Sequence, residues 1–399
     1  LDSVPLFLAL GINAFGAGMF FPFAIIYYQA VTSLPVASIG LALTSATLIT
    51  LSVNPVTGVL VDRFGARRLV VLSHCLEATG FAAYLAVSSA LSLFAAALLA
   101  TAGARMFFAS SSTLIAEMAA GADRDRWYGL VGITQSIGAS LSGVLASLLI
   151  GSTGVNGFRV IIAVNVGCLL ISAALIHRSR SARPHQRTGS ESIGYRTILR
   201  DKVFLTVIGG NLLFVLASML MGIGSAVYVT EALDAPLWSV GVIGAAQTVL
   251  VIGCQTRVSN RMSGVRRTRT MGLAGAIWIV AYLGFAAGGL IPRPLIVPYL
   301  FIVAITFTIA QLFYMPASRA LAAGMGPTEA RGRYIATYEL SWGLAAAISP
   351  AMFGIVYGLA PHAPWLVMAV GVAVAVCLLR IAEPGIPPWQ NRPGASHRR

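Results

Sequence analysis

The amino-acid sequence predicts an all-α membrane protein with twelve transmembrane helices, arranged as two pseudo-symmetric bundles of six. Three observations support this fold class: the composition, the succession of long apolar segments and the positions of the arginines. The chain has 399 residues, of which 57% are hydrophobic and 10% are charged. Soluble domains are about one quarter charged. This composition therefore provides too little polar surface for a soluble protein, whereas a bilayer accepts an apolar exterior.

The apolar segments have the length of membrane spans. A helix needs about 20 apolar residues to cross the hydrocarbon core of a bilayer. The predicted spans are 5–29, 37–60, 69–90, 91–117, 127–151, 158–177, 203–228, 237–258, 269–290, 295–322, 332–358 and 364–381. Very short gaps separate the third span from the fourth and the ninth from the tenth, so each of these pairs is expected to form a tight hairpin.

The positive charge, which is almost all arginine, lies in alternate gaps between the spans. These gaps hold Arg63, Arg67 and Arg68; Arg124 and Arg126; residues 178–202; residues 257–269; Arg331 and Arg333; and the chain after Arg380. The opposite gaps hold little more than Arg159 and Arg293. Basic loops remain in the cytoplasm, so we expect a multi-pass protein of the cytoplasmic (inner) membrane with both termini inside the cell. Charges distributed in this way do not form a nucleic-acid-binding face, and no nucleic-acid partner is expected.

A polar segment rich in arginine and serine divides the chain. It predicts an N-terminal six-helix bundle at 1–178, a cytoplasmic linker at 179–202, a C-terminal six-helix bundle at 203–381 and a cytoplasmic tail at 382–399. The tail contains scattered proline and glycine before a basic end, and we expect it to be disordered.

The second half repeats the first. Asn13 lies 49 residues before Asp62, and Asn211 lies 49 residues before Asn260. Each later residue is followed by arginine and then by glycine and a pair of arginines. Six spans separate the two copies, so both halves have the same orientation in the membrane. Parallel halves of this kind are typical of transporters, whose binding site lies between the halves near the midplane.

The loop between the second and third spans carries the most specific motif, Gly58-x-x-x-Asp62-Arg63-x-Gly65-x-Arg67-Arg68. This motif resembles the loop signature of the major facilitator superfamily, and the resemblance covers essentially the whole chain. It implies the twelve-helix fold of that family and a loop that locks the two halves together. The residues implied for the lock are Gly58, Asp62, Arg63, Gly65, Arg67, Arg68 and Glu117.

Physical chemistry supports this interpretation of the loop. Asp62 is expected to face the N-terminus of a helix, where partial positive charge favours an anion. Arg67 or Arg68 is expected to pair with Glu117 at the cytoplasmic end of the fourth span. The alternative, that the arginines only set the orientation in the membrane, accounts for neither Asp62 nor the glycines.

Charged residues inside spans need a reason, because each costs at least about 2.5 kcal/mol in the membrane. Arg105 lies about a dozen residues from either end of the fourth span. It either faces the cavity, where it binds an anionic group or influences a nearby acid, or it ties helices together through backbone carbonyls.

Two acids are candidates for protonation. Glu77 lies in the third span, one helical turn after His74, and its alternative role is a structural bond between helices. Glu339 lies in the eleventh span between Tyr338 and Trp342, and we expect these three residues to line the cavity. Burial raises the pKa of a carboxyl group toward the physiological range, so proton coupling is a hypothesis.

Five amides complete the predicted cavity. They are Asn13, Gln135, Asn211, Gln247 and Gln311. As a set they indicate a weakly polar binding site, whereas each by itself is also suited to a hydrogen bond between helices, which contributes about 0.6 kcal/mol.

These residues predict a secondary transporter of a small organic molecule, with export as the first hypothesis. Uptake of a metabolite remains open, and a membrane enzyme or a receptor ranks well below both. The sequence contains no phosphate-binding Gly-x-x-x-x-Gly-Lys loop, nucleophile elbow or metal cluster. We therefore expect neither an enzyme nor a cofactor. We expect a monomer surrounded by lipid, with a small-molecule substrate and, under the coupling hypothesis, protons as its partners.

Overall fold

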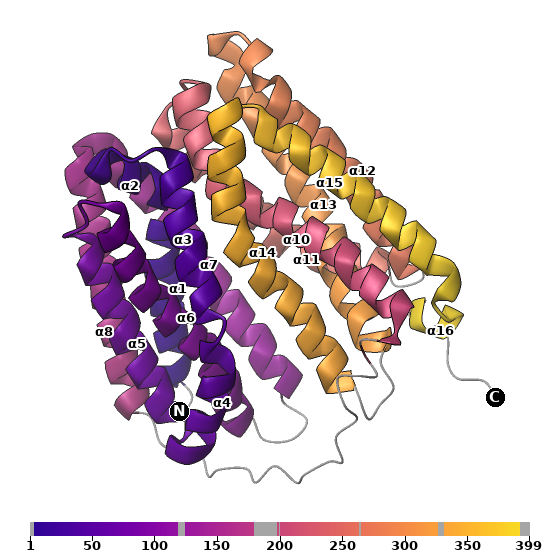
Figure 1. Cartoon of the computed structure of the whole chain (residues 1–399), viewed down its shortest axis with the longest axis horizontal. Helices are drawn as coiled ribbons and strands as arrows, with labels where there is room; N and C mark the ends of the chain where they lie inside the picture. Colours follow the sequence, from indigo (N-terminus) through magenta and orange to yellow (C-terminus); the bar gives the residue numbers. More distant parts are fainter. Residues whose placement is uncertain are drawn as a thin grey trace.

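The computed structural model is helical and describes residues 4–118, 124–178, 198, 200–262, 265–325 and 331–391. These residues contain no β-strand. For some residues inside the helices, including Asp62 and Glu117, the structure describes the helical backbone and not the side chain. Gly58 is likewise described only by its helical backbone. Figure 1 shows the helices of the first half of the chain on one side of the molecule and those of the second half on the other.

The first half consists of α1 (Val4–Phe20), the 3₁₀ turn η1 (Phe21–Phe23), α2 (Ala24–Thr32), α3 (Val36–Thr50), α4 (Val53–Phe64), α5 (Ala66–Tyr84), α6 (Ala90–Met118), α7 (Arg124–Thr153) and α8 (Val155–Arg178). The second half consists of α10 (Lys202–Val227), the π-helical turn η3 (Tyr228–Ala232), α11 (Leu237–Met262), α12 (Arg267–Ala287), η4 (Gly288–Leu290), η5 (Arg293–Leu295), α13 (Ile296–Met325), α14 (Arg331–Leu359), α15 (Ala363–Ala382), η6 (Glu383–Gly385) and α16 (Pro388–Asn391).

Eight helices in the described part of the chain are long and apolar enough to cross a membrane. The count is nine if α1 and α2, which meet at 51°, form one broken span. These nine correspond to nine of the twelve predicted spans. The other three, at 37–60, 69–90 and 127–151, are also helical. The segment 37–60 is interrupted after Thr50 and continues as α4, so neither piece is long enough alone.

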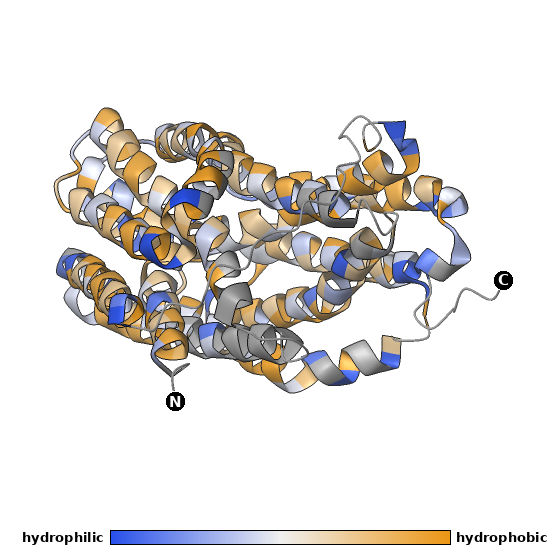
Figure 2. Cartoon of the chain, turned by 90° about the horizontal axis from the view of Figure 1, so that it is seen from below, coloured by the Kyte–Doolittle hydropathy of each residue, from blue (hydrophilic) through white to orange (hydrophobic). Residues whose placement is uncertain are grey.

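The exterior is apolar, as a lipid-facing surface requires. Hydrophobic residues dominate the helices in Figure 2. Large side chains such as those of Val59, Leu91 and Ile302 are more than 60% exposed. A soluble monomer rarely exposes apolar area on this scale, and the polar composition of the loops leaves the helices as the membrane-embedded part.

Within the first half, α1 packs on α7 and α8, α5 packs on α6 and α8, and α3 packs on α6. The hydroxyl of Tyr27 donates to the carbonyl of Tyr84 over 2.8 Å. In the second half the hydroxyl of Tyr228 donates to the carbonyl of Phe285, also over 2.8 Å and also 57 residues further along the chain. The same bond thus closes the corresponding place in each half.

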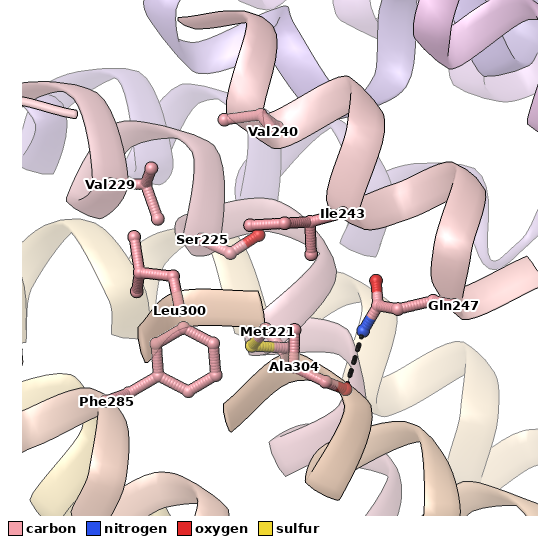
Figure 3. Close-up of a pocket in the computed structure, with 9 residues that line it drawn as sticks. All are labelled: Met221, Ser225, Val229, Val240, Ile243, Gln247, Phe285, Leu300 and Ala304. Carbon is pink, nitrogen blue, oxygen red and sulfur yellow. Dashed lines mark hydrogen bonds between the residues drawn. The ribbon is translucent and has the colours of Figure 1, made fainter. Parts of the chain in front are cut away.

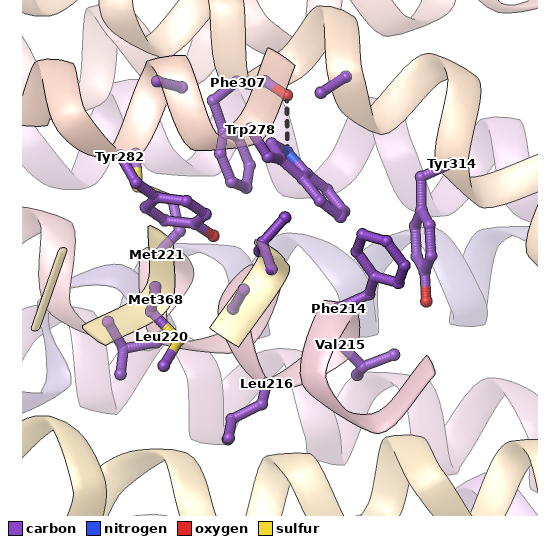
Figure 4. Close-up of a cluster of buried hydrophobic side chains, with 14 of the residues drawn as sticks. Phe214, Val215, Leu216, Leu220, Met221, Trp278, Tyr282, Phe307, Tyr314 and Met368 are labelled. Carbon is purple, nitrogen blue, oxygen red and sulfur yellow. Dashed lines mark hydrogen bonds between the residues drawn. The ribbon is translucent and has the colours of Figure 1, made fainter. Parts of the chain in front are cut away.

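Within the second half, α10 packs on α14 and α15, and α12 packs on α13 and α15. Its core is rich in aromatic rings, and Figure 4 shows Phe214, Trp278 and Tyr314 gathered there. The indole nitrogen of Trp278 donates to the carbonyl of Phe307 over 3.0 Å. Buried Trp and Tyr side chains need such partners. The polar nitrogen of Trp278 therefore has a hydrogen-bond acceptor within this apolar core.

The two halves meet mainly along two helix pairs, α3 with α14 and α7 with α11, and α10 also contacts η1 and α2. Glycines permit the closest approach. An added Cβ at Gly354 would lie 2.5 Å from the carbonyl oxygen of Val36, and one at Gly40 would overlap the carbonyl of Pro350. These contacts lie toward the end of the molecule opposite the loop that joins α4 to α5.

The beginning of the tail differs from the sequence prediction. We expected disorder from Glu383 onward, but η6 and α16 are formed and Asn391 is buried. The side chain of Asn391 accepts a hydrogen bond from the backbone nitrogen of Thr268 over 3.0 Å, which satisfies an open donor at the start of α12. We also expected residues 392–399 to be disordered and residues 179–202 to form a linker. Residues 392–399 and nearly all of the linker lie outside the part of the chain that the structure describes.

Candidate functional site

Arg105 forms a direct polar link between the two halves. Its Nη2 donates to the carbonyl oxygen of Gly343 over 3.4 Å, which joins α6 to α14. An added Cβ at Gly343 would lie 3.2 Å from Nη1 of Arg105. The absence of a side chain at 343 therefore lets the guanidinium approach the helix backbone. The sequence predicted either a cavity role or a carbonyl-binding role for Arg105; the observed contact is with a carbonyl, which belongs to the opposite half, and the cavity role stays a prediction.

Glu339 lies one helical turn before Gly343 on α14. Residues four apart share a helix face, so Glu339 is on the side that carries the Arg105 contact, and it is exposed. Its neighbour Tyr338 is buried and its hydroxyl lies 3.0 Å from the hydroxyl of Ser318. Tyr338 therefore faces into the second half, whereas Glu339 faces out of it.

Trp342 is half-buried, and its indole nitrogen has no hydrogen-bond partner of standard geometry among the described residues. The Tyr338 side chain is a polar neighbour of this indole. A buried N–H without a good acceptor is costly, and the hydroxyl of Tyr338 offsets part of this cost.

Asn211 belongs to a closed hydrogen-bond network instead of a cavity wall. Its Nδ2 donates to Oγ of Ser341 over 2.7 Å, and its Oδ1 accepts from the hydroxyl of Tyr314 over 2.6 Å. Oγ of Ser341 in turn donates to the carbonyl of Tyr338. All four residues are buried. This network ties α10, α13 and α14 together.

Gln247 lines a small cavity inside the second half, formed by α10, η3, α11, α12 and α13 (Figure 3). Its Nε2 donates to the carbonyl of Ala304 over 3.1 Å. The cavity measures about 40 Å³ and its wall is mainly apolar, with Met221, Phe285 and Leu300 around Ser225. Sites for drug-sized ligands have volumes of about 300–1,000 Å³, so this cavity is too small for one.

The remaining predicted amides, Asn13, Gln135 and Gln311, are all half-buried. None of them makes a side-chain hydrogen bond within the described ranges. Asn13 and Gln135 lie on α1 and α7, which cross closely where Gly138 approaches the carbonyl of Gly11. Their amides thus differ from that of Asn211, which is engaged on both sides.

Glu77 lies inside the first half, apart from Arg105 and Glu339. Its Oε2 is 4.0 Å from Nδ1 of buried His74. Oγ of Ser172 donates its only hydrogen to the carbonyl of Ala9, so its oxygen accepts from Nε2–H of His74 at 3.0 Å. Nδ1, which faces Glu77, is then the nitrogen open to a proton. Both roles predicted for Glu77, a structural bond between helices and protonation, stay predictions.

The loop of the sequence motif joins α4 to α5 through Gly65, which has φ of 85°. Only glycine adopts this conformation readily, which accounts for that position in the motif. Arg63 lies 5.3 Å from the ring centre of Phe64, and Arg63 and Arg68 are exposed. The predicted pairing with Glu117 and the placement of Asp62 and Gly58 concern side chains outside the described set.

Sequence reasoning missed the residues that let the halves touch. They are Gly343, which admits Arg105, and Thr44, whose Oγ1 accepts from the backbone nitrogen of Ala351 over 3.0 Å. A small polar residue and a glycine within apolar spans are common at membrane helix contacts. This was the available signal, but it does not say which partner each residue meets.

Comparison with known proteins agrees with this architecture. Residues 6–312 match the profile of the Major Facilitator Superfamily. The Escherichia coli (strain K12) protein YdeE, named an uncharacterized MFS-type transporter, is 24% identical over 376 residues, which cover 94% of this chain and 93% of YdeE. The multidrug resistance protein MdtH of Yersinia enterocolitica is 24% identical over 370 residues, which cover 88% of each chain.

Solved structures share the fold at low identity. A mutant of the nucleoside transporter NupG has a TM-score of 0.83 at 13% identity, with 96% of this chain and 100% of that chain covered. A bacterial homologue of the lysosomal transporter Spinster, in an inward-facing and occupied conformation, has a TM-score of 0.76 at 12% identity, with 96% of each covered. The profile match covers most of the chain, and its relatives are transporters and not enzymes. The chain is therefore a multi-pass membrane transporter and a member of the major facilitator superfamily.

Proposed function

We propose that this transporter exports a small amphipathic organic molecule by alternating access. The hydrogen bond between Arg105 and Gly343 carries the proposal, because it places a cation of one half against the backbone of the other. A substrate that binds between the halves and competes for this guanidinium would couple its own binding to their separation.

The proposal includes twelve spans in two six-helix bundles, with the arginine-rich ends in the cytoplasm. Support comes from the nine spans that meet the length and composition criteria and from the helical state of the other three. In this orientation the contacts between Val36 and Gly354 lie at the periplasmic end, so the conformation is inward-facing. The loop from Gly58 to Arg68 and Glu117 then serves as a lock that forms when the cytoplasmic end closes.

The class of substrate follows from the groups that remain available. Trp342 supplies an aromatic surface, Asn13, Gln135 and Gln311 supply neutral amides, and Arg105 supplies one positive charge. Such a site favours an apolar molecule with a few hydrogen-bonding groups and a weakly anionic end. Export is favoured over uptake by the name of the relative MdtH, a multidrug resistance protein.

We further propose Glu339 as the proton carrier. It is exposed and lies one helical turn before Gly343, whose carbonyl accepts the hydrogen bond from Arg105. Protonation of Glu339 would remove an anion that competes with the substrate for Arg105. Glu77 has no such position, because it packs inside the first half beside His74.

The experiment is a growth screen in an efflux-deficient bacterial host across a panel of toxic amphipathic compounds. Wild type is expected to protect against at least one compound. Arg105→Gln is expected to transport that compound at least about tenfold more slowly, because hydrogen bonds to charged groups contribute about 1.5–3 kcal/mol. Arg257→Gln, an exposed arginine at the end of α11, is the control and is expected to protect like wild type. Sensitisation of the host by wild type, or protection against no compound, would overturn export.

A further inference from the structure

A second site lies on the outer surface of the second half, away from the interface between the halves. It is a groove of about 260 Å³ between the beginning of α12 and the end of α15. Both helices are among those that meet the criteria for membrane spans. The groove therefore lies where the hydrocarbon core gives way to the headgroup region, at the arginine-rich end of the molecule.

Two arginines at this end of the groove carry uncompensated charge. Arg269 and Arg380 line it and are exposed, and neither makes an ion pair or a side-chain hydrogen bond with any residue that the structure describes. The one acid of the groove, Glu383, is already paired, since its Oε1 accepts from Nη1 of Arg266 over 3.2 Å. The groove thus presents two free positive charges.

The rest of the groove is apolar and opens outward. Leu273 and Ala276 continue from Arg269 along one exposed face of α12, at spacings of four and three residues. Half-buried Val376 of α15 lines the opposite wall. Gly272 leaves the floor open, because an added Cβ there would meet no atom within 4 Å.

This combination selects the kind of ligand. A free phosphate would use the arginines but would gain nothing from the apolar walls, and a zwitterionic lipid would leave the two charges uncompensated. A phospholipid with an anionic headgroup satisfies both parts, with its phosphate between Arg269 and Arg380 and an acyl chain along Leu273 and Ala276. Basic pockets between membrane helices recognise anionic headgroups in this way.

We propose that this groove is a binding site for an anionic phospholipid. The bound lipid fastens α15 to α12 at the end where Glu383 and the following helix α16 also meet α12. It therefore stabilises the second half without occupying the transport pathway.

The test uses the purified full-length protein in detergent and native mass spectrometry with phosphatidylglycerol or phosphatidylcholine. Wild type is expected to retain phosphatidylglycerol in preference to phosphatidylcholine. The double variant Arg269→Gln/Arg380→Gln is expected to bind phosphatidylglycerol about thirtyfold more weakly, from the typical contribution of two basic residues near a membrane surface. Gly272→Leu fills the groove without removing charge and is expected to weaken binding as well.

The matched control is Arg257→Gln/Arg261→Gln, which removes two exposed arginines from the end of α11, outside the groove. It is expected to bind phosphatidylglycerol like wild type. Equal binding by the groove variant and the control would overturn the proposal, as would equal retention of the two lipids by wild type. Thermal unfolding provides a second readout. Phosphatidylglycerol should raise the unfolding temperature of wild type and not of Gly272→Leu, and an equal rise with inorganic phosphate alone would exclude a lipid site.

Discussion

The backbone nitrogen of Ala351 donates a hydrogen bond to Oγ1 of Thr44 over 3.0 Å, across the boundary between α14 and α3. Pro350, the residue before this nitrogen, lies inside α14 and cannot donate to the helix ladder. The helix continues through this proline, but it lacks one backbone hydrogen bond where it meets the other half. The carbonyl of the same proline lies against Gly40. Backbone groups at the proline of α14 therefore join the two halves at this end of the molecule.

Replacing Thr44 with valine should weaken this end. The substitution keeps the shape of the side chain and removes the acceptor, so the closed state should lose about 0.6 kcal/mol, which changes the ratio of closed to open molecules about threefold. Spin labels at Ser33 and Leu359, two exposed residues at that end, should report a larger fraction of long distances. The labels require a background without the native cysteines.

Thr47→Val is the control for Thr44→Val, because the hydroxyl of Thr47 donates to the carbonyl of Leu43 within its own helix. Its distance distribution should match wild type. If both variants shift the distribution equally, the bond across the halves does not determine the closed state.

Gly40→Ala and Gly354→Ala should prevent closure at the same end. Each added methyl group would meet a backbone carbonyl of the opposite half, and backbone cannot turn aside as a side chain can. We expect transport to fall at least about fivefold, the scale for overpacking that costs about 1–3 kcal/mol, and the labels at Ser33 and Leu359 to move apart. Gly358→Ala has the same effect on helix propensity in α14 but meets no atom within 4 Å. Transport by Gly358→Ala should equal wild type, and a comparable loss there would contradict the steric argument.

Glu339→Gln should abolish the response of transport to an imposed pH gradient. The amide keeps the size of the side chain but cannot take up a proton, so the exchange between proton and substrate at Arg105 would be lost. The measurement is substrate flux in vesicles with and without the gradient. Glu77→Gln should retain the response, because Glu77 lies beside His74 within the first half. A response that survives Glu339→Gln and disappears in Glu77→Gln would assign coupling to the pair inside the first half instead.

Asn211→Ala should lower stability more than Asn13→Ala. The first substitution leaves the buried hydroxyl of Tyr314 without its acceptor and removes the hydrogen bond that Ser341 accepts, which costs about 1–2 kcal/mol. The second removes an amide that bonds to no residue in the described part of the chain. Thermal unfolding of each variant in detergent, followed by tryptophan fluorescence, measures the difference. Equal unfolding temperatures would show that the network does not hold α10 to α13 and α14.

The sequence predicted the helices well because membrane helices obey a local rule. A span must satisfy its own backbone and present apolar side chains for about 20 residues, and both conditions can be tested in one segment at a time. The prediction was less accurate at 37–60, where the chain breaks after Thr50, and at the tail, where Asn391 caps α12 from more than 100 residues away. Both outcomes depend on partners that are distant in the sequence.

The candidate site shows the same division. Arg105 was recognisable by itself, since a charge in the middle of an apolar span is rare and needs a purpose. Asn13 and Asn211 have equivalent places in the repeat, yet only Asn211 is engaged in a buried network. The repeat determines where a residue lies in the fold, whereas the neighbouring helices determine whether its amide remains available.

Local composition by itself determined that this chain is a helical membrane protein with arginine-rich loops and an isolated arginine in one span. The tertiary structure decided that Arg105 reaches Gly343, that Glu77 lies beside His74 inside the first half, and that Arg269 and Arg380 border one groove. The physical reason is that hydrophobic length and charge bias act within a segment. A hydrogen bond between helices or an unfilled groove depends on how two distant segments cross, which no single segment encodes.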